Sequence, residues 1–123
     1  MTDTTEIQRK TLPAATLGAT TSVDRVEIQQ IELPPGKTVG IHRHPCPVVG
    51  YVAAGAIDFQ IEGKAVQHLH SGDAFYEPSG ARVAHFDNAS ASVGATFIAF
   101  YLLANGQREL IEMIKQPEGS NAN

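Results

Sequence analysis

The chain has 123 residues, of which 42% are hydrophobic and 18% are charged, so a single domain with its own core is expected. The net charge is −4 and the basic residues are dispersed, which argues against nucleic acid or an anionic membrane surface as a partner. The apolar runs are shorter than the ~20 residues that a membrane-spanning helix needs. With one cysteine, Cys46, and no apolar leader, we expect a cytoplasmic protein without an intrachain disulfide.

The first 22 residues are rich in Thr and Ala without a clear period, and we interpret residues 1–22 as a loosely ordered N-terminal arm. The hydrophobic period then becomes two, which is typical of β-strands. The apolar residues change parity between Ile28 and Ile31. A β-bulge is therefore expected at Gln29–Gln30.

Short strand-like segments follow, separated by Gly, Pro, Asn and Asp turn signals. The expected strands lie at 48–53, 57–62, 65–70, 74–77, 82–87 and 96–103. The segment 107–115 is the helical candidate because Leu110, Ile111 and Ile114 recur at helical spacing. These patterns predict an all-β domain over 23–115, a sandwich or small barrel with a short C-terminal helix or extension, and a frayed tail at 116–123.

Two histidines stand two residues apart, at His42 and His44. Side chains at this spacing project from the same face of a strand, so both imidazoles can reach one divalent metal ion at ~2.1 Å. His68 and His70 have the same spacing, but Leu69 between them has the parity of a core residue. We therefore expect that second pair to face solvent.

The sequence around the first pair resembles the two motifs of the cupin superfamily. The positions that agree with the motifs are Gly36, His42, His44, Gly55, Gly72, Pro78 and Gly80. The resemblance covers residues 36–88, about half of the chain. It implies a double-stranded β-helix, the cupin or jelly-roll barrel, with a ligand pocket inside the barrel.

Two ligand positions of the cupin pattern are not met. The motif glutamate falls on Val48 and the motif histidine on Val83. His85 follows two residues later, on what the alternation indicates is the same strand face. The resemblance therefore implies a metal held by His42, His44 and the displaced His85.

Other residues could complete or border the site. Glu77 would give a set of two histidines and one carboxylate, which suits non-haem iron, or it is a rim glutamate in solvent. Cys46 could supply a thiolate, or it is a small buried residue. Arg43 and Arg82 are candidates for binding an anionic substrate group. The expected pocket-lining residues are Tyr51, Phe59, Phe75, Val48 and Val83.

Imidazole ligands suit Fe, Ni, Cu, Zn and, less well, Mn, so the sequence predicts a divalent transition metal of undetermined identity. An incomplete ligand set favours a metal-dependent oxygenase, isomerase or lyase acting on a small polar molecule. The alternative is a non-catalytic small-molecule or metal-binding module. Segment 96–103 is apolar at both parities, which predicts a homodimer that covers its second face.

Overall fold

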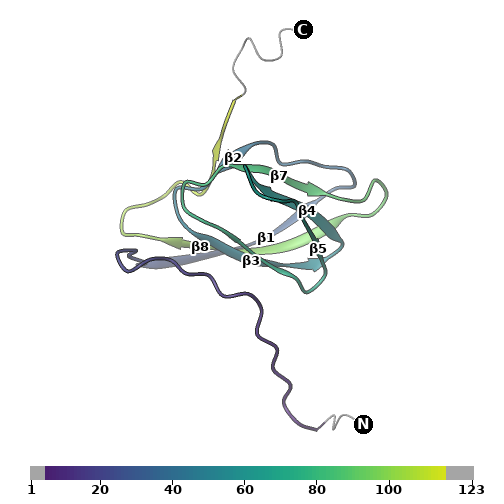
Figure 1. Cartoon of the computed structure of the whole chain (residues 1–123), viewed down its shortest axis with the longest axis horizontal. Helices are drawn as coiled ribbons and strands as arrows, with labels where there is room; N and C mark the ends of the chain where they lie inside the picture. The colour runs from purple at the N-terminus through teal and green to yellow at the C-terminus, as the bar shows by residue number, and fades with distance from the viewer. Residues whose placement is uncertain (1–4, 116–123) are drawn as a thin grey trace.

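The computed structural model describes residues 5–115 and forms two antiparallel sheets that face each other (Figure 1). One sheet has the strand order β1 (Arg25–Leu33), β8 (Ala95–Leu103), β3 (Val48–Ala54) and β6 (Ala74–Glu77). The other has the order β5 (Gln67–His70), β4 (Ala56–Ile61), β7 (Val83–Asn88), β2 (His42–Arg43) and β9 (Glu112–Met113). The expected frayed tail at 116–123 lies outside the described residues.

The core lies between the two sheets because most strands alternate between buried and more exposed residues. In β8, all five residues of one parity are buried, from Ala95 to Leu103. Four phenylalanines from β4, β6, β7 and β8 pack in edge-to-face or tilted contacts, with ring centroids 4.7–6.0 Å apart. They are Phe59, Phe75, Phe86 and Phe97. This cluster fills one part of the interior, and a cavity lies beside it.

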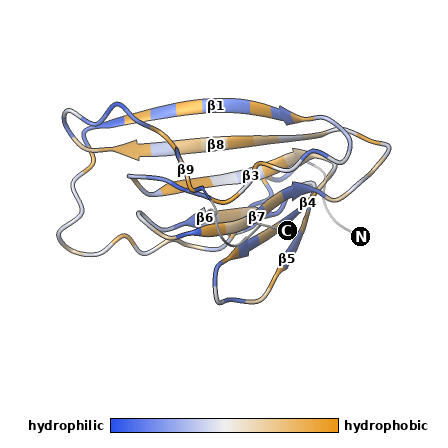
Figure 2. Cartoon of the chain, turned by 90° about the horizontal axis from the view of Figure 1, so that it is seen from above, coloured by the Kyte–Doolittle hydropathy of each residue, from blue (hydrophilic) through white to orange (hydrophobic). Residues whose placement is uncertain are grey.

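The first strand differs from its expected register. β1 pairs with β8 from Arg25 to Leu33 without a shift, so the bulge expected at Gln29–Gln30 is wrong. The long, regular partner strand dictates the alternation, and it turns Val26 and Ile28 outward, where 47% and 61% of their surface is exposed. Figure 2 shows the resulting mixture of hydrophilic and hydrophobic residues along β1. Its partly buried polar residues therefore point toward the interior.

The C-terminal segment 107–115 is extended, so the expected helix is also wrong. β9 pairs with β2, and the backbone N–H of Ile114 donates to the carbonyl of Ile41 at 2.9 Å. These partners lie in another part of the chain and replace the hydrogen bonds that a helix would make within itself. Within residues 5–115, no helix long and apolar enough to cross a membrane is present.

Candidate metal centre

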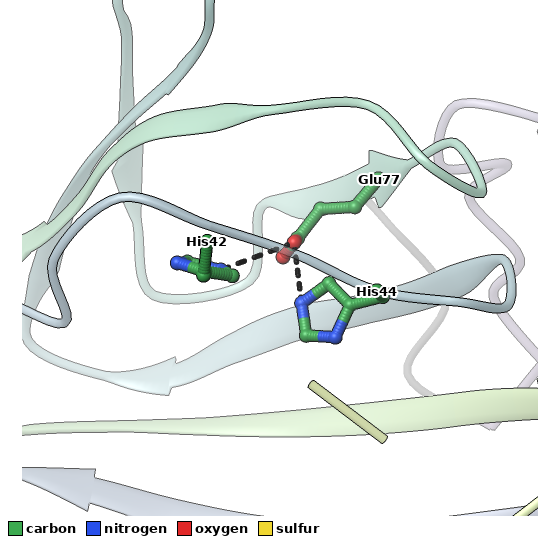
Figure 3. A group of neighbouring side chains, drawn as sticks. All are labelled: His42, His44 and Glu77. Carbon is green, nitrogen blue, oxygen red and sulfur yellow. Dashed lines mark ion pairs between the residues drawn. The ribbon is translucent and has the colours of Figure 1, made fainter. Parts of the chain in front are cut away.

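Three buried side chains converge between the sheets (Figure 3). His42 lies on β2, His44 follows it by two residues, and Glu77 ends β6. Their exposed fractions are 2%, 4% and 3%. Glu77 Oε2 lies 2.8 Å from His44 Nε2 and 3.6 Å from His42 Nε2. The expected pair of histidines on one face is therefore present, and a carboxylate from the opposite sheet joins it.

Backbone carbonyls orient both imidazole rings. His42 Nδ1 lies 2.8 Å from the carbonyl oxygen of Gly40, and His44 Nδ1 lies 2.5 Å from that of Leu110. A carbonyl oxygen only accepts hydrogen bonds, so each Nδ1 carries the proton and donates it. In a neutral ring the lone pair is then on Nε2, the nitrogen that faces Glu77. This second layer of hydrogen bonds is characteristic of histidines that bind metals.

In the metal-free group, His44 and Glu77 shift each other's pKa. Burial lowers the pKa of His44, but the contact with Glu77, its negative charge and the Leu110 carbonyl outweigh burial, so the pKa is raised. Burial raises the pKa of Glu77, but the contacts with His42 and His44 outweigh it, so this pKa is lowered. Without a metal, the site therefore favours a charged pair of His44 and Glu77.

The three side chains fit a divalent cation. Two atoms that each lie ~2.1 Å from one ion at right angles are ~3.0 Å apart, close to the 2.8 and 3.6 Å separations found here. All three ligand atoms lie within 4.8 Å of one another. Glu77 Oε2 is also buried, and among the described residues it has no partner that meets the criteria for a hydrogen bond, although His44 Nε2 lies 2.8 Å away. A cation between the three groups would satisfy this oxygen and both lone pairs.

The carboxylate occupies the place that the linear motif assigns to Val48. In the pairing of β3 with β6, Val48 lies directly opposite Glu77, and both are buried. The acidic group of this chain therefore lies on the neighbouring strand, on the same interior face as Val48. Val83 pairs with His42 and is fully buried, so no ligand stands at that second position. The described part of the chain offers three ligands at this centre.

His85 does not belong to the centre, which corrects the expected three-histidine set. The pairing of β4 with β7 shifts between Gln60 and Ile61, so that Ala84 is an extra residue on β7. This bulge turns Val83 and Phe86 both inward and leaves His85 outside. There the His85 side chain is 56% exposed, and its Nδ1 lies 2.9 Å from Asp87 Oδ2.

The other candidate side chains are not part of the ligand group. Cys46 is buried, and burial raises the pKa of its thiol, so the thiolate that a metal needs is disfavoured. Leu69 is buried and its neighbours His68 and His70 are exposed, as the strand parity predicts. Arg43 pairs with Glu112 at 2.7 Å and Arg82 with Glu62 at 3.2 Å, both at partly exposed positions.

The ligand group opens on a cavity of about 280 Å³ inside the barrel. Its walls include Val48 and the polar residues Gln29 and Tyr101, and the remainder is mostly apolar. Burial raises the pKa of Tyr101 to about 12, so its phenol is a neutral hydrogen-bond donor. Of the other expected lining residues, Phe59, Phe75 and Val83 pack in the core beside the cavity, and Tyr51 lies on the outer face of β3.

A comparison with protein families agrees with this architecture. Residues 29–101, more than half of the chain, match the model of the family described as "Cupin domain". The chain is a cupin. The match includes His42 on β2, His44 just after it and Glu77 at the end of β6, the three buried ligands. The expected double-stranded β-helix is confirmed, and its C-terminal segment is an extension rather than a helix.

Several relatives of this cupin are known. It is 27% identical over 96 residues to dimethylsulfoniopropionate lyase DddQ of Ruegeria pomeroyi, which covers 78% of this chain and 45% of the relative. The chain thus spans about half of that relative's length. The crystal structure of a cupin-like protein from Thermotoga maritima has a TM-score of 0.61 at 20% identity, over 72% of this chain and 64% of the other. Oxalate oxidase in complex with the substrate analogue glycolate also has a TM-score of 0.61, at 21% identity over 72% and 46%.

Proposed function

We propose that the protein is a metal-dependent enzyme that acts on a small carboxylic acid inside the barrel. The observation that carries this proposal is the buried group of two histidines and one carboxylate that opens on the cavity. Structural zinc sites close the coordination shell with protein ligands, whereas this group leaves positions open for other molecules. His42, His44 and Glu77 would hold the metal.

The ligand set favours iron(II). Two imidazoles and one carboxylate with open positions form the set that non-haem iron(II) oxygenases use. A bound metal would polarise the substrate and, if it is iron, activate dioxygen. Two neutral histidines and one Glu77 carboxylate leave a divalent ion with one net positive charge. An anionic substrate group is therefore attracted to the centre, and the mostly apolar walls favour a short carbon chain behind that group.

A hydrogen-bond acceptor in the cavity narrows the substrate class. Gln29 Nε2 donates to Glu27 Oε2 at 3.2 Å, and Arg25 Nη1 binds the other oxygen of Glu27 at 3.2 Å. Because a carboxylate only accepts hydrogen bonds, the amide nitrogen of Gln29 must face Glu27. The Gln29 carbonyl oxygen is the end that can accept from a ligand. We propose a substrate with a hydroxyl or amino group on the carbon chain.

The cavity volume sets the size of this substrate. Liquid water occupies ~30 Å³ per molecule, so a cavity of about 280 Å³ holds roughly nine waters. An acid of a few carbon atoms fits this space. Tyr101 lines the cavity with its ring centroid 5.7 Å from that of His44, and its neutral phenol would donate a hydrogen bond to an oxygen of the bound acid.

Lyase chemistry is the second candidate, favoured by the 27% identity to a lyase over 78% of this chain. The names of that lyase and of oxalate oxidase both specify small carboxylates. A lyase needs no dioxygen, which separates the two candidates in an assay. In either reaction, the residues of this chain bind the acid, orient it and keep bulk water away from it.

Metal loading followed by turnover tests the proposal. The metal-free protein is loaded without oxygen with Fe²⁺, Mn²⁺ or Zn²⁺, and bound metal is measured by elemental analysis. We expect one ion per chain. Loaded protein is then incubated with short carboxylic acids while dioxygen and products are followed. Oxygen uptake supports the oxygenase, product without uptake supports the lyase, and a bound ion without turnover of any acid supports a non-catalytic binding module.

The role of Gln29 is testable with matched acids. Isothermal titration of the Zn²⁺-loaded protein should show that 3-hydroxypropionate or 4-hydroxybutyrate binds about two- to tenfold more tightly than propionate or butyrate, the value of one neutral hydrogen bond. Gln29→Leu should abolish this preference and leave the binding of the unhydroxylated acids unaltered. If the preference persists in the variant, Gln29 does not contact the hydroxyl.

The homodimer stays a proposal, supported by the outer face of the four-stranded sheet. Exposed or half-buried apolar residues of β1, β3 and β8 lie side by side on it. They are Val26, Ile28, Val49, Tyr51, Ile98 and Phe100. We expect sedimentation at micromolar concentration to give a dimer, and Ile28→Lys to shift it toward monomer. A monomeric parent protein would contradict this prediction. The expected cytoplasmic location also stays a prediction.

A further inference from the structure

Residues 107–115 form an extended strap beside the metal centre. The carbonyl of Leu110 accepts the hydrogen bond of His44 Nδ1 at 2.5 Å. The next residue, Ile111, lines the cavity on which the ligands open. β9 then pairs with β2 at the level of His42. The strap therefore contacts a metal ligand, the cavity and the strand that carries the first histidine.

Both ends of the strap are tied to the segment that bears the two histidines. At the start, Gln107 Nε2 donates to the carbonyl of Pro45 at 2.7 Å. At the far end, Glu112 Oε1 accepts from Arg43 Nη2 at 2.7 Å. Arg43 lies between His42 and His44 in the sequence. Movement of the strap would therefore act directly on the residues that position the ligands.

Leu110 packs against the core, but most of the other side chains of the strap are exposed. Ile111 and Met113 are 42% and 53% exposed, and the side chains of Arg43 and Glu112 are 47% and 50% exposed. Segments with little buried apolar surface and exposed hydrogen bonds open at low free-energy cost. Release of the strap can therefore occur without unfolding the barrel.

We infer that the strap is a positioning element of the metal centre, and that its docking and metal binding at His44 stabilise each other. This inference rests on the proposed metal binding. When the strap is docked, the Leu110 carbonyl keeps the His44 proton on Nδ1 and the lone pair on Nε2. When the strap is released, the hydrogen bond that fixes that tautomer is lost, and the ring is less firmly oriented. Because coupling is reciprocal, a metal on Nε2 makes Nδ1 a better donor and holds the strap in place.

Limited proteolysis tests the coupling. A glutamyl endopeptidase can cleave after Glu109 and Glu112 in the strap, and after Glu6 in the exposed N-terminal arm. Saturating Zn²⁺, a redox-inert probe ion, should slow cleavage at Glu109 by about tenfold or more. Cleavage at Glu6 is the internal control for the protease and should not change. In His44→Ala the Zn²⁺ effect on Glu109 should disappear.

A matched pair of variants tests the effect of strap docking on metal binding. Glu112→Gln removes the ion pair at the tip of the strap, and Glu62→Gln removes the similar, partly exposed pair with Arg82 on the other side of β7. Both make the same change in charge. We expect Glu112→Gln to weaken Zn²⁺ binding by about two- to fivefold, the usual range for exposed pairs, and to speed cleavage at Glu109. Glu62→Gln should alter neither, and both metal-free variants should unfold near the parent temperature.

The outcomes separate the coupling from the metal proposal. If elemental analysis shows bound Zn²⁺ but cleavage at Glu109 is unchanged, the coupling is wrong and the metal centre stands. Equal Zn²⁺ affinities of Glu112→Gln and Glu62→Gln would also overturn it. If no Zn²⁺ binds to the parent protein, the proposed function fails and the coupling fails with it.

Discussion

Glu77→Gln will lower the affinity of the protein for a divalent metal by at least about a hundredfold, because loss of a group that only supports a ligand already costs ten- to a hundredfold. Glutamine has nearly the same shape but no charge. A site of two neutral histidines and an amide would bind the ion mainly through the imidazoles. Competition with a chromophoric chelator measures the affinity of parent and variant.

Stability measurements separate loss of a ligand from loss of the fold. Glu77 is a buried carboxylate, and its burial costs solvation energy that the histidines offset. The metal-free variant should therefore stay folded by circular dichroism. His85→Gln is the matched control, since this histidine is exposed and outside the ligand group. Retention of full metal affinity by Glu77→Gln, or its loss in His85→Gln, would contradict the assignment.

The second large effect concerns pH. Metal will raise the unfolding temperature more at pH 8 than at pH 5.5, because His44 must lose its proton before Nε2 can bind the ion. Its raised pKa makes protons stronger competitors than at an ordinary histidine. Below that pKa, metal affinity should fall about tenfold per pH unit, or ~1.4 kcal/mol. At fixed excess metal this corresponds to roughly 5 °C per pH unit in a domain of this size.

The metal-free protein should show the opposite trend over part of this range. His44, with its raised pKa, stabilises the fold fully below its ordinary value of 6.5, and this contribution is lost as pH rises through the raised pKa. Glu77, with its lowered pKa, contributes fully above 4.5, and this is lost as pH falls through the lowered pKa. The pair is therefore complete between pH 4.5 and 6.5.

Thermal unfolding with and without Zn²⁺, from pH 5 to 8, measures both trends. The two melting curves should diverge as pH rises. His85→Gln should reproduce the parent curves, because its side chain does not touch the centre. A metal-induced shift of the same size at pH 5.5 and pH 8 would mean that metal binding displaces no proton from His44.

The strands and the first two ligands could be predicted from sequence because they depend on local alternation. His42 and His44 share a face, and Leu69 identifies the inner face of β5. The same rule contained the signal for Glu77, since Phe75 two residues earlier is a core residue on the same face. Alternation within one short strand does not reveal which strand lies beside it, or which residues the two strands pair. The pairing of β6 with β3 supplies that information.

The errors occurred where a partner strand overrides local pattern. His85 is turned outward by one extra residue on β7, and the bulge depends on pairing with β4. β1 takes its alternation from β8, so Glu27 and Gln29 face inward although Val26 and Ile28 are the apolar residues. The apolar residues of 107–115 have helical spacing, but the segment is extended because it forms hydrogen bonds with β2 and His44. Each of these contacts joins residues that are distant in sequence.

The direct pairing of Val48 with Glu77 bears on how such sites can be recognised and rebuilt. Side chains at paired positions on one face of a sheet lie close enough to exchange a role. A ligand can therefore cross from one strand to its neighbour while the pocket keeps its chemistry, even though the order and spacing of ligands along the chain change. A search that reads spacing alone would discard this chain at the valine. A template that specifies positions on adjacent strands would retain this chain. Such a template would also give designers two strand positions at which the carboxylate ligand can be placed.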